Sequence, residues 1–296
     1  MSEQTIPKID VAGLKISSVK KTELLSAISA RIKSNHKTFV CTPYSEFLHA
    51  TFIKPEFRDV LNSADFAIAD GIGILWARYF LSIPMFFKRY YLSIVESWVQ
   101  VAWTGATILL NPKRLYQNGI PEKIVGADFA WDLARLAAEN NFSLYLLGGM
   151  GDVPEVTSKV LKNNFPNLNI VGASNKDMND ESIFFFFYLV KPDMLFVAFK
   201  AQTAEEWIVS NLENLPVKFV IALGGTFDYI AGKKKQPPRF VRNAGLEWLY
   251  RLITQPSRVH RIFNATWGLV LGLVRYKVFD NAGFRANGVA VVVNSE

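Results

Sequence analysis

A strand followed at once by a tight glycine turn occurs three times in the chain, and this pattern constrains the fold most. The expected strands are 66–69, 144–147 and 219–223. The turns that follow them are Asp70-Gly71, Gly148-Gly149 and Gly224-Gly225. Helical spacing of apolar residues follows the first two turns, so strands and helices alternate. The sequence therefore predicts an α/β fold, a Rossmann-like mostly parallel sheet with helices on both faces.

The remaining periodic segments fit the same fold. We expect a strand or hairpin at 9–17, strands at 38–42, 169–171 and 194–199, and helices at 20–32, 44–52 and 55–62. Ligands of such sheets bind beyond the carboxyl ends of the strands. Asp70, Gly149 and Gly225 should therefore lie at the site.

The length of 296 residues fits one large α/β domain or two small ones, since a domain usually has roughly 100 to 200 residues. We expect a Rossmann-like domain at 1–238, interrupted by an apolar insert at about 84–120. A basic and apolar appendage follows at 239–296, and we expect it to be helical and to dock on the membrane. The charged N-terminus has no apolar signal segment, which favours the cytoplasm.

The net charge of +7 lies almost wholly in one run from Lys233 to Arg261. Such a run attracts phosphates of nucleic acid, of anionic lipids or of a pyrophosphate substrate. Nucleic acid is the weakest of these, because no RRM, KH or helix-turn-helix signature is present and the neighbouring residues are apolar. The single cysteine, Cys41, and three scattered histidines argue against a His/Cys metal site.

Three stretches are unusually apolar. Residues 92–110 contain one charge, Glu96, and approach the roughly 20 apolar residues of a membrane span. Basic residues flank this stretch on both sides, so an interfacial or re-entrant helix fits better than a crossing. A buried helix or a homo-oligomer interface remains an alternative. We expect 262–274 to be a surface anchor and 183–190 to be buried under the sheet.

The carboxylates carry the most chemistry. Asp70 directly follows a strand, where it can accept a proton from an acceptor hydroxyl or simply cap the next helix. Asp228 can bond a ribose or a base, or cap its own turn. No D-x-D sequence is present, so Arg, Lys and backbone dipoles would have to stabilise a pyrophosphate leaving group. The glycine turns can approach a phosphate, although each can also be only a turn.

Four blocks then make the chain resemble the WecG/TagA/CpsF family of glycosyltransferases. They read VLNSADFAIADGIGILWA at 60–77, EKIVGADFAWDLA at 122–134, LYLLGGMGDVPE at 144–155, and ALGGTFDYIAGKKKQPPRFVRNAGLEWLYRLITQPSRVHR at 222–261. The resemblance implies transfer of a sugar, typically of the N-acetylmannosamine type, from a UDP-sugar to an undecaprenyl-pyrophosphate-linked sugar. It also implies inversion, no metal and no other cofactor, at the cytoplasmic face of the membrane.

The resemblance also assigns roles to single residues. Asp70 matches the family's proposed general base, Thr42 its nearby threonine, and Asp228 an acid at the nucleotide. Lys123 stands where members have arginine, and it keeps the charge without the bidentate fork. A basic segment thought to dock on the membrane and close over the pyrophosphate is matched by Arg239, Arg242, Arg251, Arg258 and Arg261.

Two departures from the family pattern leave an alternative open. Tyr44 replaces the usual asparagine, and the loop at 200–207 lacks the family's lysine and glutamine. The alternative is a catalytically silent relative that binds nucleotide-sugar or lipid as a scaffold. Retention of Asp70 and Thr42 argues for the enzyme.

Overall fold

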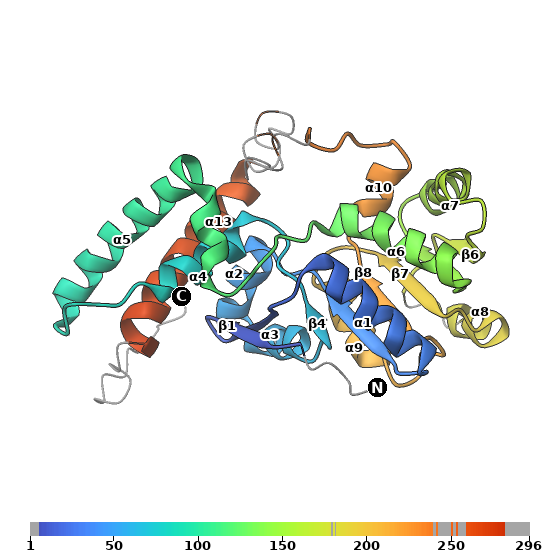
Figure 1. Ribbon diagram of the computed structural model, residues 1–296, viewed down its shortest axis with the longest axis horizontal. Coiled ribbons are helices and arrows are strands. Elements are labelled where there is room, and N and C mark those ends of the chain that lie inside the picture. The colour runs from blue at the N-terminus through green and yellow to red at the C-terminus, as the bar shows by residue number, and fades with distance from the viewer. Residues whose placement is uncertain are drawn as a thin grey trace.

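A computed structural model describes residues 6–178, 180, 182–238, 241, 250, 253 and 259–281. A six-stranded parallel sheet has the order β4-β3-β8-β7-β5-β6, and a separate antiparallel hairpin pairs β1 with β2 (Figure 1). The strands are β1 (Lys8–Val11), β2 (Leu14–Ser17), β3 (Thr38–Cys41), β4 (Phe66–Ala67), β5 (Leu144–Gly148), β6 (Ile170–Ser174), β7 (Met194–Ala198) and β8 (Phe219–Ala222). Every predicted strand is therefore present.

Helices connect these strands. They are α1 (Lys21–Lys33), α2 (Ser45–Ile53), α3 (Pro55–Asn62), α4 (Ile72–Ser82), α5 (Tyr90–Leu110), α6 (Gly126–Asn140), α7 (Val153–Asn164), α8 (Ser182–Val190), α9 (Thr203–Asn211), α10 (Thr226–Ile230) and α13 (Val259–Arg275). A 3-10 helix, η1 (Pro112–Asn118), follows α5, and a π-helix, η3 (Tyr276–Asn281), extends α13.

Alternate strand residues point to opposite faces, and each face has its own core. Phe39 and Cys41 of β3 pack with α2, α3, α4, α8, α9 and α13. Val40 of the same strand packs with α1, α6, α7 and α10. Both sides of the sheet are thus covered by helices, which confirms the predicted fold class.

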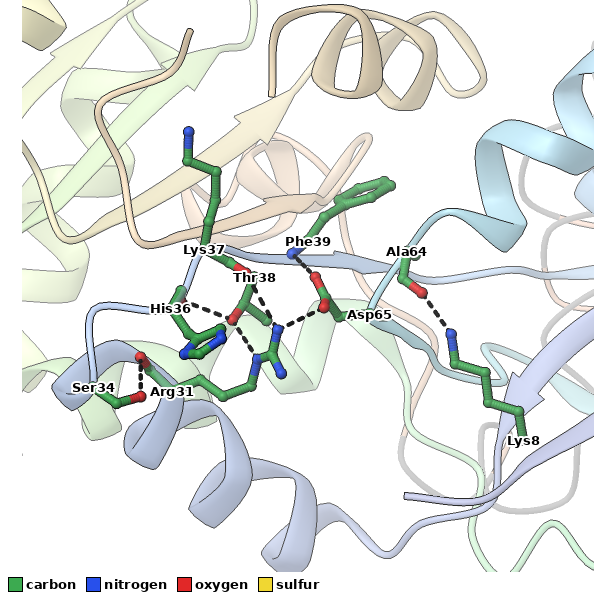
Figure 2. A network of polar contacts seen from close by, with 9 residues as sticks. All are labelled: Lys8, Arg31, Ser34, His36, Lys37, Thr38, Phe39, Ala64 and Asp65. Carbon is green, nitrogen blue, oxygen red and sulfur yellow. Dashed lines mark hydrogen bonds and ion pairs between the residues drawn. The ribbon is translucent and has the colours of Figure 1, made fainter. Parts of the chain in front are cut away.

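A polar network closes the amino ends of β3 and β4, at the edge away from the predicted site. Figure 2 shows Arg31 of α1 between Thr38 and Asp65. The Arg31 guanidinium donates to Thr38 Oγ1 at 2.9 Å and to Asp65 Oδ1 at 2.6 Å. Asp65 Oδ2 accepts the Phe39 backbone N–H at 2.8 Å. This network joins α1 to the two strands, so its role is structural.

The C-terminal helix α13 packs closely on α2, and two glycines allow it. A Cβ at Gly268 would come within 2.1 Å of His49, and one at Gly272 within 2.2 Å of Phe52. Leu269 of α13 is buried in the core. The predicted surface anchor at 262–274 therefore buries one face of its helix against α2, while Trp267 and Leu271 on the other face stay exposed.

Helix α5 lies at one end of the molecule, with α13 between it and α2 (Figure 1). Its contact with α4 includes a hydrogen bond from Trp76 Nε1 to Thr104 Oγ1 at 3.0 Å. Among the described helices, none combines the length and apolarity that a membrane crossing requires.

Helix α8 differs from its prediction. Ile183 and Phe187 are buried, and the Phe187 ring meets the Tyr145 ring edge-on with centroids 5.0 Å apart. Phe185 and Leu189, on the other side, are 68% and 69% exposed. The prediction of burial under the sheet is wrong for this outer side, because nothing in the described part of the chain covers it.

Candidate functional site

The loops after β3 and β4 meet at the carboxyl edge of the sheet. Thr42 follows β3 and Asp70 follows β4 by three residues. The Asp70 backbone N–H donates to Pro43 O at 2.9 Å, which holds the two loops together. The Ile124 N–H donates to Ala69 O at 3.2 Å, so the segment leading into α6 runs beside Asp70. Three parts of the chain therefore converge here.

Gly126, the first residue of α6, completes this group. A Cβ built on it would lie 3.2 Å from Asp70 Oδ2 and 3.5 Å from Thr42 Cγ2. Its φ is not positive, so a side chain here would be limited by the space beside Asp70 rather than by backbone conformation. Thr42, Asp70 and Gly126 thus share one small volume, and α6 begins beside it without a side-chain cap.

Lys123 precedes this group on the same segment. It is half-buried and adjoins Ile124, whose backbone is bonded next to Asp70. The structure therefore brings Lys123, Thr42 and Asp70 into one region. Tyr44, the departure from the family pattern, starts α2 here and donates its hydroxyl to Glu46 at 3.1 Å.

Gly148 and Gly149 end β5 further along the same edge. A Cβ at Gly148 would lie 2.7 Å from Ala198 O of β7, and the Gly149 N–H donates to that oxygen at 2.9 Å. Both glycines have positive φ, so this turn requires glycine for conformation and for close approach of two strands. The turn leads directly into α7.

Gly224, Gly225 and Asp228 follow β8. Gly224 has a φ of 50°, and Gly225 precedes α10. The Asp228 carboxylate forms an ion pair with Lys234, and the Lys234 backbone N–H donates to Asp228 O at 3.0 Å. A Cβ at Gly225 would lie 3.7 Å from Asp228 Oδ2. Asp228 thus holds the start of the basic run beside the glycine turn.

The two groups adjoin because β3 and β8 are neighbours in the sheet. Val40 is in register with Ile221, so Thr42 and Leu223 leave the sheet side by side. The helix after β3 covers one face, whereas α10 after β8 covers the other. This change of side is where ligands bind in open α/β sheets.

Glu205, near the start of α9, escaped the sequence analysis. It is buried, one of its oxygens has no hydrogen-bond partner in the described structure, and burial raises its pKa to about 7. Burial, together with the charge of Glu205, also raises the pKa of the Cys41 thiol, next to Thr42. Gly126 was missed as well. The sequence signal for Glu205 was an acid three residues after the N-cap of α9. The signal for Gly126 was a glycine at the start of a helix.

The arginines of the basic run fall mostly beyond the described residues. Arg239, Arg242, Arg251 and Arg258 lie outside them, and Arg261 falls within α13. In the described ranges, no group of three His, Cys, Asp or Glu side chains is placed to hold a metal ion.

Comparison with known proteins identifies a family and its named relatives. The sequence profile of the "Glycosyl transferase WecG/TagA/CpsF family" matches residues 9–110 and 88–283. An N-acetylglucosaminyldiphosphoundecaprenol N-acetyl-beta-D-mannosaminyltransferase of Staphylococcus aureus (strain MRSA252) is 22% identical over 258 residues. The match covers 86% of this chain and 88% of that relative. The enzyme of the same name from strain NCTC 8325 / PS 47 matches at the same identity and coverage.

Proposed function

Since the chain belongs to the WecG/TagA/CpsF family and is a glycosyltransferase, we propose a specific reaction for it. It transfers an N-acetylmannosamine-type sugar from a UDP-sugar to a sugar linked to polyprenyl diphosphate, with inversion. Relatives named for this type of acceptor and sugar support the proposal. The reaction belongs to cell-surface polysaccharide synthesis. A lipid-linked acceptor supports a place at the cell membrane, and we propose its cytoplasmic face.

The observation that carries the proposal is the convergence of Asp70, Thr42 and Gly126. The bare glycine leaves room beside the Asp70 carboxylate for an acceptor hydroxyl. Asp70 takes the proton of that hydroxyl. The hydroxyl oxygen of the acceptor then attacks the anomeric carbon of the donor, and UDP leaves. Attack from the side opposite to UDP inverts the anomeric configuration.

The donor would bind along the neighbouring strand ends. The turns at Gly149 and Gly225 offer close approach to a diphosphate, and the start of α7 follows the first of them. Asp228 and Lys234 now pair with each other. A nucleotide offers each of them a new partner, since a ribose hydroxyl can bond Asp228 and a phosphate can bond Lys234. The proposal requires no metal ion, because these groups and the basic run stabilise the leaving diphosphate.

The proposed reaction also assigns a role to each of the two predicted parts of the chain. Residues 1–238 would supply the catalytic domain. Residues 239–296 would form an appendage that closes over the diphosphate and meets the membrane, through Arg239, Arg242, Arg251, Arg258 and Arg261.

Replacing Asp70 with asparagine tests the reaction. We expect Asp70→Asn to lower kcat by about 10² to 10⁴-fold with UDP-N-acetylmannosamine and a polyprenyl-diphosphate-linked N-acetylglucosamine acceptor. Asp59→Asn, at an exposed carboxylate on α3, is the matched control and should leave kcat unchanged. Wild-type turnover should persist in EDTA. A loss below about tenfold in Asp70→Asn would remove Asp70 as the base.

The silent-scaffold alternative predicts a different result. The altered loop at 200–207, at the start of α9, motivates this alternative. Ala204, which is fully buried, stands in this loop where the family has glutamine. A scaffold would bind UDP in calorimetry, and Asp228→Ala would weaken that binding, yet no donor would turn over. Turnover by the wild type with any UDP-sugar excludes this reading.

A further inference from the structure

Helix α5 has its polarity reversed. Every exposed side chain that the structure describes on it is apolar or aromatic. All the large ones except Tyr90 form a single stripe along its length, at Tyr91, Leu92, Val95, Val99, Trp103 and Leu110. The buried side chains of its inner face include five polar ones, Ser93, Ser97, Gln100, Thr104 and Thr107. A helix of a soluble domain normally presents the opposite arrangement to water.

The inner polar side chains are bonded, so the helix cannot simply rotate to hide its apolar face. Thr104 accepts from Trp76, as described above, and Gln100 Nε2 donates to Pro84 O at 3.1 Å. Lys277 of η3 is buried, and its ammonium donates to Gln100 Oε1 and to Phe80 O. Glu96, the one charged residue of α5, accepts the Phe86 and Phe87 backbone N–H groups at 2.8 and 3.0 Å. Rotation would break all of these bonds.

The exposed stripe continues onto neighbouring segments. The Trp98 ring lies 6.3 Å from that of Trp267 on α13, where Trp267 and Leu271 are 45% and 54% exposed. Phe86 and Phe87 precede the helix and are exposed as well. Figure 1 shows α5 and α13 together at one end of the molecule, away from α7 and α8. We call the stripe of α5 with Trp267 and Leu271 the α5 face.

We propose that the α5 face docks flat into the interface of an anionic lipid bilayer. The helix is about 31 Å long, given 1.5 Å per residue. Exposed cationic side chains lie at both of its ends, Lys88 and Arg89 before it and Lys113 and Arg114 after it. Apolar side chains with tryptophan and tyrosine between cationic ends fit the acyl and headgroup layers of such a surface. Both ends then stay on the side of the membrane that holds the protein.

A second copy of the chain fits this face less well. In a two-fold pair, α5 would lie either parallel or antiparallel to its copy. Either arrangement brings the cationic end of one helix to a cationic end of the other. The stripe also carries only the hydroxyl of Tyr91 and the indole N–H of Trp103 as polar groups, whereas protein interfaces usually form about one hydrogen bond per 100–200 Å².

The inference deepens the proposed function, since a membrane surface is where a polyprenyl-linked acceptor is held. It also defines the orientation of the enzyme relative to the membrane. Docking through α5 places α13 and α2 between the lipid and the sheet, and α2 starts next to Thr42 and Pro43. The acceptor would therefore reach Asp70 along the α2 and α4 side of the molecule.

Vesicle sedimentation of the full chain tests the docking. We expect the wild type to sediment with vesicles of phosphatidylglycerol and phosphatidylcholine at 1:1, less so in high salt, but still measurably. Val95→Ser/Val99→Ser/Trp103→Ser changes side chains that are 61%, 63% and 65% exposed, so folding should persist. Its partition coefficient should fall about tenfold or more, because three apolar groups leave the lipid contact.

The matched control lies on the other exposed apolar helix. Phe185→Ser/Leu189→Ser changes two equally exposed side chains of α8 and should sediment like the wild type. Equal sedimentation of the α5 triple variant and the wild type would overturn the proposal. A second outcome would also overturn it. If light scattering without vesicles detects a dimer of the wild type that the triple variant no longer forms, a second copy of the chain covers the α5 face. UDP calorimetry on the wild type separates the docking from the reaction: a wild type that sediments with vesicles but does not bind UDP would refute only the proposed function.

Discussion

Helices α5 and α6 are the two longest of the described helices that precede the basic run, and they are built in opposite ways. On α6, Phe129 and Leu133 are fully buried, while Arg135 and Glu139 face the solvent. On α5, serine and threonine are buried, while Val99 and Trp103 face outward. Apolar burial therefore holds α6 to the sheet, whereas hydrogen bonds hold much of α5 to its neighbours. The outer side of α6 therefore suits water, whereas the outer side of α5 suits the bilayer proposed above.

Truncating one apolar side chain on each helix should give the largest contrast. Leu133→Ala removes a fully buried side chain of α6 and should lower the free energy of unfolding by about 2–5 kcal/mol. Val99→Ala on α5 should change it by no more than about 0.5 kcal/mol, because the side chain is 63% exposed. Urea unfolding at one pH measures both. Equal losses would mean that Val99 is buried against protein, and the contrast would fail.

Loss of a polar contact on the inner face of α5 should lower the free energy of unfolding by a smaller amount. Thr104→Val keeps the shape but removes the hydroxyl that accepts from Trp76 Nε1, which leaves a buried N–H without its partner. We expect a loss of about 1–3 kcal/mol. Thr104→Ser retains the hydroxyl and should recover most of that loss. A Thr104→Val variant as stable as the wild type would show that polar burial does not hold α5.

Lys277 should give the smallest effect at any one step of the measurement, because it is seen only as a slope of stability with pH. Burial lowers the pKa of Lys277 to about 8 from an ordinary value of 10.5, although Glu96 partly opposes this. Between these values the unfolded chain binds more protons than the native one, so stability rises with pH. The slope is at most about 1.4 kcal/mol per pH unit.

Lys277→Met isolates this contribution. Thermal unfolding at pH 8, 9 and 10 should show the wild type gaining stability relative to the variant as pH rises. A difference between the two proteins that stays constant over this range would mean that Lys277 keeps its proton in the native state.

Much of the sheet could be predicted from the sequence, because parallel strands buried on both faces are short, continuous apolar runs. The runs at 38–41, 194–198 and 219–222 are fully buried. Their neighbours in the sheet were not predictable, since β3 pairs with β8 across some 180 residues of chain. Asp70 was found because it directly follows such a run, whereas Thr42 was assigned only by the resemblance to the family. That they meet depends on backbone bonds between loops, which leave no pattern in the sequence.

The apolar helices were harder to predict, because hydrophobicity alone does not say which face is buried. Residues 92–110 and 183–190 are both apolar, yet the first buries its polar side chains and the second buries only Ile183 and Phe187. The burial of the threonines of α5 could not be predicted without knowing their contacts, such as those of Thr104 with Trp76 and Gln100. The role of Gly126 needed the position of Asp70, since a glycine at a helix start otherwise suggests only a turn.

Gly126 also sets evolutionary pressures against each other. Alanine is favoured over glycine within helices by up to roughly 0.5–1 kcal/mol, and the φ at this position permits it. The added methyl group would occupy the space 3.2 Å from the Asp70 carboxylate, where the acceptor hydroxyl is proposed to enter. A screen for turnover would therefore remove Gly126→Ala, whereas a screen for thermal tolerance would accept it wherever the Asp70 carboxylate can shift by a few tenths of an ångström. In an engineered library, loss of alanine from this position would report selection for turnover.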